Sequence, residues 1–193
     1  QAKNAMERTS NHGNMLTSRL FICALIAQFL YVGAQTGVGC FFINYALETV
    51  PDMSAKTAGL LLSIGCMGMF FIGRLLSSYI MKWIRPAHLL AVFGLLGALC
   101  MALVVFRLGT ASFAGLFLSY FFMAPMFPTI FALGVKGMGA KTKKASSLLV
   151  MCVVGGAVFP IVMGWLGQTD MAMGFILPLV AFAFIALYGI MNK

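Results

Sequence analysis

Three polar side chains recur at helical spacing inside the first long apolar run, AQFLYVGAQTGVGCFFINYA. Gln28, Tyr31 and Gln35 lie within about 60° of one another on a helix, and Gly39 continues the stripe. Amide and phenol groups donate and accept hydrogen bonds, so they can bind the hydroxyls of a polyhydroxylated ligand. The same groups can instead hydrogen-bond a neighbouring helix, because an unpaired Gln in hydrocarbon is costly. Three such groups on one stripe favour the wall of a wet cavity.

The fourth apolar run carries a second face, which consists of Tyr120, Met123, Phe127 and Phe131. Pro125 and Pro128 lie beside it in FFMAPMFPTIF, although a proline in a helix interior costs roughly 3 kcal/mol. The pair predicts either a plain kink, whose freed carbonyls bond to neighbours, or a discontinuous helix of the kind that marks binding sites in transporters. Pro160, with Gly155–Gly156 in the fifth run, predicts a second break.

Composition places these runs in a lipid bilayer. Hydrophobic residues make up 62% of the chain, charged residues 9%, and the mean hydropathy is +1.01. A spanning helix needs roughly 20 apolar residues, and the runs lack the alternating pattern of membrane barrel strands. The sequence therefore predicts an all-α membrane protein with six transmembrane helices, at about 20–47, 58–81, 89–106, 111–135, 146–166 and 172–191.

Charged residues divide the loops into two sets. Basic residues precede the first span, follow the second and fourth spans and end the chain. The other three loops together hold Glu48, Asp52 and Asp170, with only Lys56 and Arg107 as basic residues. Because basic loops stay in the cytoplasm, we expect a multi-pass protein of the cell membrane with both termini cytoplasmic. Residues 1–18 are expected to be a cytoplasmic linker, and 19–193 a transmembrane domain. This topology explains the net charge of +9 without nucleic acid, since no aromatic-basic surface accompanies it.

Patterns of catalytic or metal-binding residues do not emerge from the sequence. No Asp, Glu, Lys or Arg lies in the middle of a span, so a carboxylate that couples transport to protons would lie elsewhere. Nucleophile–base pairs and metal-ligand spacings are missing too, so we expect no enzyme, cofactor or metal site. The five cysteines fall inside spans without CxxC spacing, which indicates small buried hydrophobic residues.

Four segments, in this order, resemble the C-terminal six-helix half of the fucose–galactose–proton symporter family within the major facilitator superfamily: YVGAQTGVGCFFINYA, FFIGRLLSSYIMKWIRP, PTIFALGVKGMGAKTKKASSLLVM and GGAVFPIVMG. The resemblance runs from about Arg19 to the end of the chain. It implies a secondary active sugar transporter, whose two halves bind the sugar between them at the midplane and open alternately. The implied partners are a sugar, protons, the lipid bilayer and a missing N-terminal half.

The same resemblance implies roles for individual residues. Gln35 and Tyr31 match the glutamine-bearing seventh helix of the family, and Tyr120 matches the proline-broken tenth. GRLLSSYIMK resembles a degenerate copy of a basic loop motif without its acidic residue, and the coupling carboxylates of the family lie in the N-terminal half. The expected sugar-binding residues are Gln28, Tyr31, Gln35, Tyr120, Met123 and Phe127, and the expected conformational residues are Gly73, Arg74, Pro125, Pro128 and Pro160.

A second hypothesis comes from a different class. The chain would be a non-transporting six-span assembly subunit or a channel, in which the polar stripe of the first span only packs helices. An N-terminal half with an intramembrane carboxylate, encoded upstream in the same reading frame, would favour the symporter.

Overall fold

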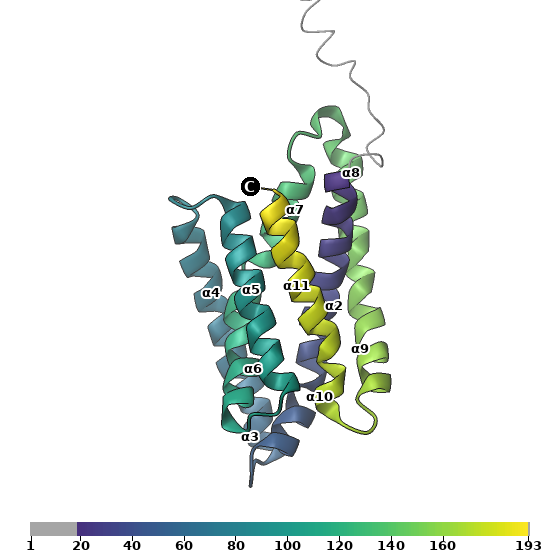
Figure 1. Cartoon of the computed structure of the whole chain (residues 1–193). Helices are drawn as coiled ribbons and strands as arrows, with labels where there is room; N and C mark the ends of the chain where they lie inside the picture. Colours follow the sequence, from purple (N-terminus) through teal and green to yellow (C-terminus); the bar gives the residue numbers. More distant parts are fainter. Residues whose placement is uncertain (1–18, 193) are drawn as a thin grey trace, which may run out of the picture.

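The computed structural model describes residues 19–192, and every regular element in this part of the chain is helical. Six helical segments are long and apolar enough to cross a membrane, and Figure 1 shows them side by side in one upright bundle. The first span is α2 (Arg19–Thr49). The second span consists of α3 (Ala55–Leu60), a π-helix (Leu61–Cys66) and α4 (Met67–Ile80). The third span is α5 (Pro86–Val105). The fourth span is α6 (Thr110–Met123) with α7 (Met126–Val135). The fifth span consists of a 3-10 turn (Gly139–Lys141), α8 (Thr142–Met151), a second 3-10 turn (Cys152–Val154) and α9 (Gly155–Leu166). The sixth span consists of α10 (Met171–Gly174) and α11 (Ile176–Met191).

The fifth span differs most from the predicted boundaries. It begins at Gly139 rather than at Ser146, whereas the other spans begin within a few residues of the predicted positions. Hydropathy reports only the part of a helix that lies in hydrocarbon, while the helical hydrogen bonds continue through the Lys-rich segment 141–144. The predicted cytoplasmic linker, residues 1–18, lies outside the described residues.

Helices α5 and α11 approach each other closely along a seam of small residues. A Cβ atom added at Gly94 of α5 would lie 2.8 Å from the backbone nitrogen of Ala186. One added at Gly189 of α11 would lie 2.6 Å from the backbone nitrogen of Ala91. Small residues allow such close approach between membrane helices. We call this contact between α5 and α11 the seam.

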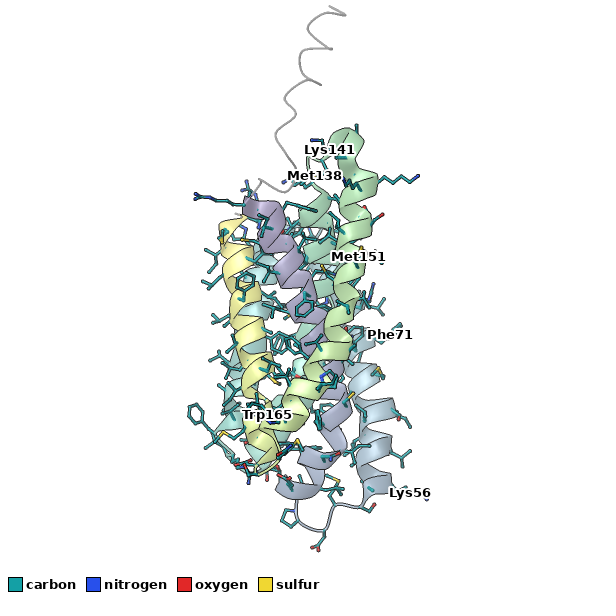
Figure 2. All side chains as sticks on the ribbon, turned by 90° about the vertical axis from the view of Figure 1, so that its right-hand side faces the viewer. Lys56, Phe71, Met138, Lys141, Met151 and Trp165 are labelled. Atoms are coloured by element: carbon teal, nitrogen blue, oxygen red, sulfur yellow. The ribbon has the colours of Figure 1, made fainter. Side chains whose placement is uncertain are left out.

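The second and fifth spans are much less buried than the other four. In their most apolar stretches only 11% and 22% of the residues are buried, against 50–56% in the others. In Figure 2 the fifth span, with Met151 and Trp165, faces the viewer, and α4, with Phe71, lies at the right-hand edge; all three side chains are exposed. We call these two spans, 55–80 and 139–166, the open side.

The cysteines depart in part from the sequence prediction. Cys66 and Cys100 are buried, Cys23 and Cys152 are half-buried, and Cys40 is exposed. The prediction of a buried residue is wrong for Cys40 because α9 covers a neighbouring flank of α2. That flank holds Gly33 and Gly37, which face Phe159 and Met163 of α9.

Ion pairs join three loops at one end of the bundle. The guanidinium of Arg107 pairs with Glu48 at 3.0 Å and also with Asp170. Asp170 in turn caps α10 by accepting the backbone N–H of Ala172 at 2.8 Å. This end carries all three acidic residues of the described chain, Glu48, Asp52 and Asp170. The loops after the second and fourth spans, at the opposite end, are basic.

Candidate functional site

The polar stripe of α2 lies between α7 and α9. On one flank Ala24 packs against Gly134 of α7, and on the other Gly33 packs against Phe159 of α9. Gln28 and Tyr31 are fully buried, whereas Gln35 is half-buried. The three residues therefore share a helix face but not an environment, and only Gln35 reaches the surface of this half.

Tyr31 joins α2 to the interruption in the fourth span. Its hydroxyl donates a hydrogen bond to the backbone carbonyl of Met123 at 3.0 Å. Its ring meets that of Phe127 edge to face, with centroids 6.1 Å apart. About two turns further along α2, a Cβ added at Gly39 would lie 3.6 Å from the hydroxyl of Tyr120. The two faces that the sequence singles out, on the first and fourth spans, thus pack against each other.

The fourth span is divided where the proline pair begins. Helix α6 ends at Met123 and α7 starts at Met126, with Ala124 and Pro125 between them. Thr129 donates to the carbonyl of Pro125 from its backbone N–H at 3.2 Å and from its hydroxyl at 2.7 Å. Together with the bond from Tyr31 to Met123, these contacts satisfy carbonyls at the break, as a membrane interior requires.

Two buried polar side chains have no hydrogen-bond partner among the described residues. They are Gln28, through both its amide nitrogen and its amide oxygen, and Tyr120, through its hydroxyl. Burying such a group unpaired costs about 1–3 kcal/mol or more. Tyr120 lies in the contact between the first and fourth spans, where its ring also meets Phe42 edge to face with centroids 6.1 Å apart. The site therefore holds unused hydrogen-bonding capacity.

Gly73 places the open side directly against the break. A Cβ added at Gly73 of α4 would lie 2.5 Å from the carbonyl oxygen of Phe121 and 3.1 Å from the Cβ of Ala124. In a continuous helix the N–H four residues later would bond this carbonyl, but that residue is Pro125, which has no N–H. Arg74, the next residue, is exposed. Gly73 thus contacts the backbone at the interruption directly.

The predicted break at Pro160 lies elsewhere in the structure. Helix α9 runs through Pro160 from Gly155 to Leu166, and the irregular turn of this span is Cys152–Val154. Gly155, immediately after that turn, packs against the backbone carbonyl of Phe29 in α2. The span therefore changes geometry where it meets α2, and proline chemistry alone did not locate that point.

No family model matches the chain, but individual proteins do. The chain is 37% identical over 169 residues to the L-fucose-proton symporter of Escherichia coli (strain K12), and the aligned region covers 86% of this chain and 38% of the relative. It is 29% identical over 183 residues to a glucose/galactose transporter of Brucella abortus, covering 94% and 44%. A crystal structure of the major facilitator superfamily transporter FucP, in the outward conformation, superposes with a TM-score of 0.89 at 33% identity, covering 93% of this chain and 44% of that one. The chain is homologous to one half of these major facilitator transporters.

This homology agrees with the fold and with the composition. The six helices of the chain correspond to half of the superfamily fold, and the homologues are transporters rather than enzymes. The chain spans less than half the length of the curated relatives it matches. The predicted fold class, an all-α membrane protein that forms one half of a major facilitator fold, is confirmed.

Two features of this six-helix half escaped the sequence analysis. Thr36 is half-buried beside Gln35, and its hydroxyl oxygen lies 2.9 Å from where a Cβ on Gly156 of α9 would be. The π-helix Leu61–Cys66 interrupts the second span, and such segments often occur at functional sites. A hydroxyl next to a stripe residue was a usable signal for Thr36, whereas nothing in LLSIGC marks a π-helix.

Proposed function

We propose that this chain forms the C-terminal half of a proton-coupled sugar symporter that works by alternating access. A sugar of the fucose, galactose or glucose type binds against α2 and the break between α6 and α7. The observation that carries the proposal is the contact between the two polar faces, in which Gln35 stays half-buried and Tyr120 keeps an unused hydroxyl. The named substrates of the relatives, L-fucose and glucose/galactose, support a sugar.

The chemistry of the site suits a sugar, which presents hydroxyl groups and C–H surfaces. Amide groups of Gln28 and Gln35 and the hydroxyl of Tyr120 can each donate to and accept from sugar hydroxyls. Phe127, half-buried beside Tyr31, offers an apolar surface to the C–H groups, and Met123 supports it from the break. Each hydrogen bond formed in this water-poor place contributes about 0.5–1.5 kcal/mol.

Proton coupling requires a group that this half does not supply. In the described spans the acidic side chains lie at one end of the bundle and are absent from mid-depth, so we assign the coupling carboxylate to an N-terminal half. The divided fourth span and Pro125, Pro128 and Gly73 beside it supply the flexible element that moves as the halves rock. Arg74 and Pro160 remain proposed conformational residues.

The open side is where we place the partner half. Helix α4 buries only Gly73 and Ser77 inside the chain. Phe71 of α4 and Ile161 of α9 point outward, at 63% and 75% exposure. In the complete transporter we expect both termini of this half in the cytoplasm of the cell that carries it. Cysteines placed at Gly137 and at Asp52 test this orientation, because a membrane-impermeant thiol reagent should reach them from opposite sides.

Transport by complementation tests the proposal. We expect the chain alone, in proteoliposomes, to accumulate none of L-fucose, D-galactose or D-glucose when a proton gradient is imposed, because it lacks a coupling carboxylate and a second gate. Co-expressed with an N-terminal six-helix half, it should accumulate at least one of them, and a protonophore should abolish the uptake. Accumulation by the chain alone would refute the half-transporter proposal.

One observation favours the alternative of a non-transporting subunit or channel. The hydroxyl of Tyr31 is already bonded inside the bundle, which is what a packing role for the stripe requires. In that case co-expression would restore no uptake, and Gln35→Ala would loosen the bundle without an effect on sugar. An ion conductance of the chain alone in planar bilayers would identify the channel.

A further inference from the structure

A cavity of about 560 Å³ lies where α4 turns into α5, at the basic end of the bundle. None of its lining residues belongs to the candidate sugar site. Leu89 and Phe93 form a buried floor, and Trp83, Ile84 and Val92 form exposed walls. Its volume falls in the range of about 300–1,000 Å³ that is typical of small-molecule sites.

The shape of the cavity is fixed by the backbone and by ring packing. In the turn, the N–H groups of Trp83 and Ile84 both donate to the carbonyl of Ile80 at 3.0 Å. At the floor, the ring of Phe93 packs against that of Phe122, with centroids 5.5 Å apart. Backbone hydrogen bonds therefore fix the turn, and ring packing fixes the floor of the hollow.

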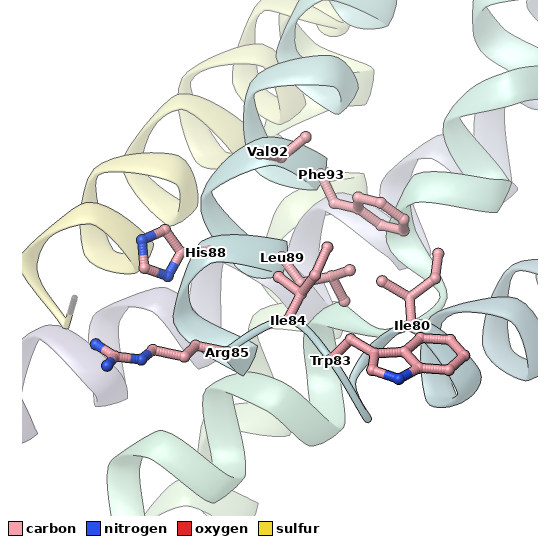
Figure 3. A pocket seen from close by; sticks show the side chains of 8 residues that line it. All are labelled: Ile80, Trp83, Ile84, Arg85, His88, Leu89, Val92 and Phe93. Carbon is pink, nitrogen blue, oxygen red and sulfur yellow. The ribbon is translucent and has the colours of Figure 1, made fainter.

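Positive charge lines one edge of the cavity. Figure 3 shows Arg85 and His88 on the same side of α5, opposite Trp83 and Ile80. Lys82 lies next in the turn, with its ammonium 5.2 Å from the ring centroid of Tyr79. The acidic residues of the described chain all lie at the other end of the bundle, so no carboxylate there neutralises this edge.

Aromatic side chains place the cavity at the level of lipid headgroups. The rings of Tyr79 and Trp83 meet edge to face with centroids 4.6 Å apart, and both residues are largely exposed. Exposed Trp and Tyr beside basic residues at a helix end are typical of the membrane interface. The apolar part of the cavity then points into hydrocarbon and its charged edge toward the headgroups.

We propose that this cavity binds an anionic phospholipid. One acyl chain lies along Leu89 and Val92, where an apolar hollow that opens on hydrocarbon gives water no hydrogen-bond partners. The headgroup phosphate lies at Arg85, with His88 beside it. Every phospholipid can supply the acyl chain, so the charge at the edge of the cavity decides which headgroup is bound most tightly. Basic pockets at the ends of membrane helices favour anionic headgroups.

The two tryptophans of the chain provide a matched pair of reporters. Trp83 lines the cavity, and Trp165 lies at the opposite end of the bundle with nearly the same exposure, 70% against 71%. In Trp165→Phe protein, brominated phosphatidylglycerol should quench Trp83 at a lower mole fraction than brominated phosphatidylcholine. In Trp83→Phe protein, the two lipids should quench Trp165 alike. Equal quenching of Trp83 by the two lipids would overturn the proposal.

Substitutions then separate a site from general surface charge. In the Trp165→Phe background, Arg85→Gln should reduce the preference of Trp83 for phosphatidylglycerol about fivefold, the effect of one basic residue near anionic lipid. Lys143→Gln, an exposed lysine at the same end of the bundle, should leave it unchanged. Val92→Phe fills the cavity and should remove the preference with all charges intact. Equal effects of Arg85→Gln and Lys143→Gln would show nonspecific attraction and refute the site.

Other occupants give different results. Millimolar glycerol 3-phosphate, which has the phosphate without acyl chains, should not restore the fluorescence of Trp83, and restoration would show a soluble phosphate site instead. A change in oligomeric state of Val92→Phe protein on size exclusion, with lipid preference intact, would show that a second copy covers the cavity. Either outcome would overturn the proposal.

Discussion

The seam and the open side are built from similar small residues and yet are opposite kinds of surface. At the seam, Gly94 and Gly189 bring two backbones together, and both helices are half buried. On the open side, Gly73 also meets a backbone, but Ser77 is the only other buried residue of α4. A close glycine contact therefore does not by itself show that a helix belongs to the core. What distinguishes the two regions is whether large side chains surround the contact.

This difference indicates which part of the half is rigid and which part adapts. Around the seam, Phe182 and Met101 are fully buried, so a displaced helix would have to move a packed core. Around Gly73, the neighbouring Phe71 and Ile72 face outward, so α4 can shift at little cost to packing. In a transporter that rocks, we expect the mobile contact to lie on the side that meets the other half.

The largest effect is expected at the seam. In Gly189→Ala, the added methyl would lie 2.6 Å from the backbone nitrogen of Ala91 and 2.9 Å from the carbonyl oxygen of Ala87. Neither backbone atom can turn away, so we expect a loss of roughly 1–3 kcal/mol of unfolding free energy, toward the upper end of that range. Thermal unfolding of the purified protein in detergent measures this loss.

Gly97→Ala is the matched control for the seam. The nearest atoms to an added methyl there are side-chain carbons of Met126 and Phe182 at 3.5 Å, an ordinary van der Waals distance. This variant should keep or slightly raise the unfolding temperature, because Ala favours helix. Similar behaviour of Gly97→Ala and Gly189→Ala would remove the distinction between the seam and other glycine contacts.

The next effect concerns Gln35, which lies between the packed and the open parts of α2. In the complete transporter, Gln35→Ala should remove one or two hydrogen bonds to the sugar at about 1–1.5 kcal/mol each. That corresponds to about a 5- to 100-fold loss of sugar affinity, with the folded fraction nearly unchanged. Cys40→Ala, exposed and off the stripe, should leave affinity intact. Unchanged affinity with lower thermal stability in Gln35→Ala would assign Gln35 to packing.

A smaller effect on stability is expected at Gly73. The methyl of Gly73→Ala would lie 2.5 Å from the carbonyl oxygen of Phe121, but α4 can move outward, so we expect about 1 kcal/mol or less. Gly68→Ala on the same helix, with no atom within 4 Å, should be neutral or slightly stabilising. If Gly73→Ala costs as much as Gly189→Ala, the open side is as rigid as the seam and the comparison fails.

The sequence predicted the helices well because the bilayer imposes long apolar runs that any spanning helix must show. It predicted the stripe of α2 less well, since Tyr31 and Gln35 differ by only about 40° in helical phase. Tyr31 is fully buried and its hydroxyl donates to the carbonyl of Met123, whereas Gln35 is half-buried. Helical phase says which residues share a face, but the crossing helices decide which part of that face is covered. The same reason explains why Cys40 is exposed and why the irregular turn precedes Pro160.

The smallest effect separates the two ends of the bundle. Arg107 ties Glu48 and Asp170 together, but its side chain is 47% exposed, and solvent screens such pairs, so Arg107→Gln should cost about 0–1 kcal/mol. The cost should shrink further as the salt concentration rises from 0.01 to about 1 M, where the screening length falls to about 3 Å. Lys56→Gln, at an exposed lysine in the first turn of α3 at the same end, controls for the loss of one positive charge. Thermal unfolding at low and high salt measures both variants. A loss that is large and independent of salt would mean that Arg107 holds the three loops together as firmly as the seam holds α5 to α11, and rigidity would then depend on the loops at this end as well as on helix packing.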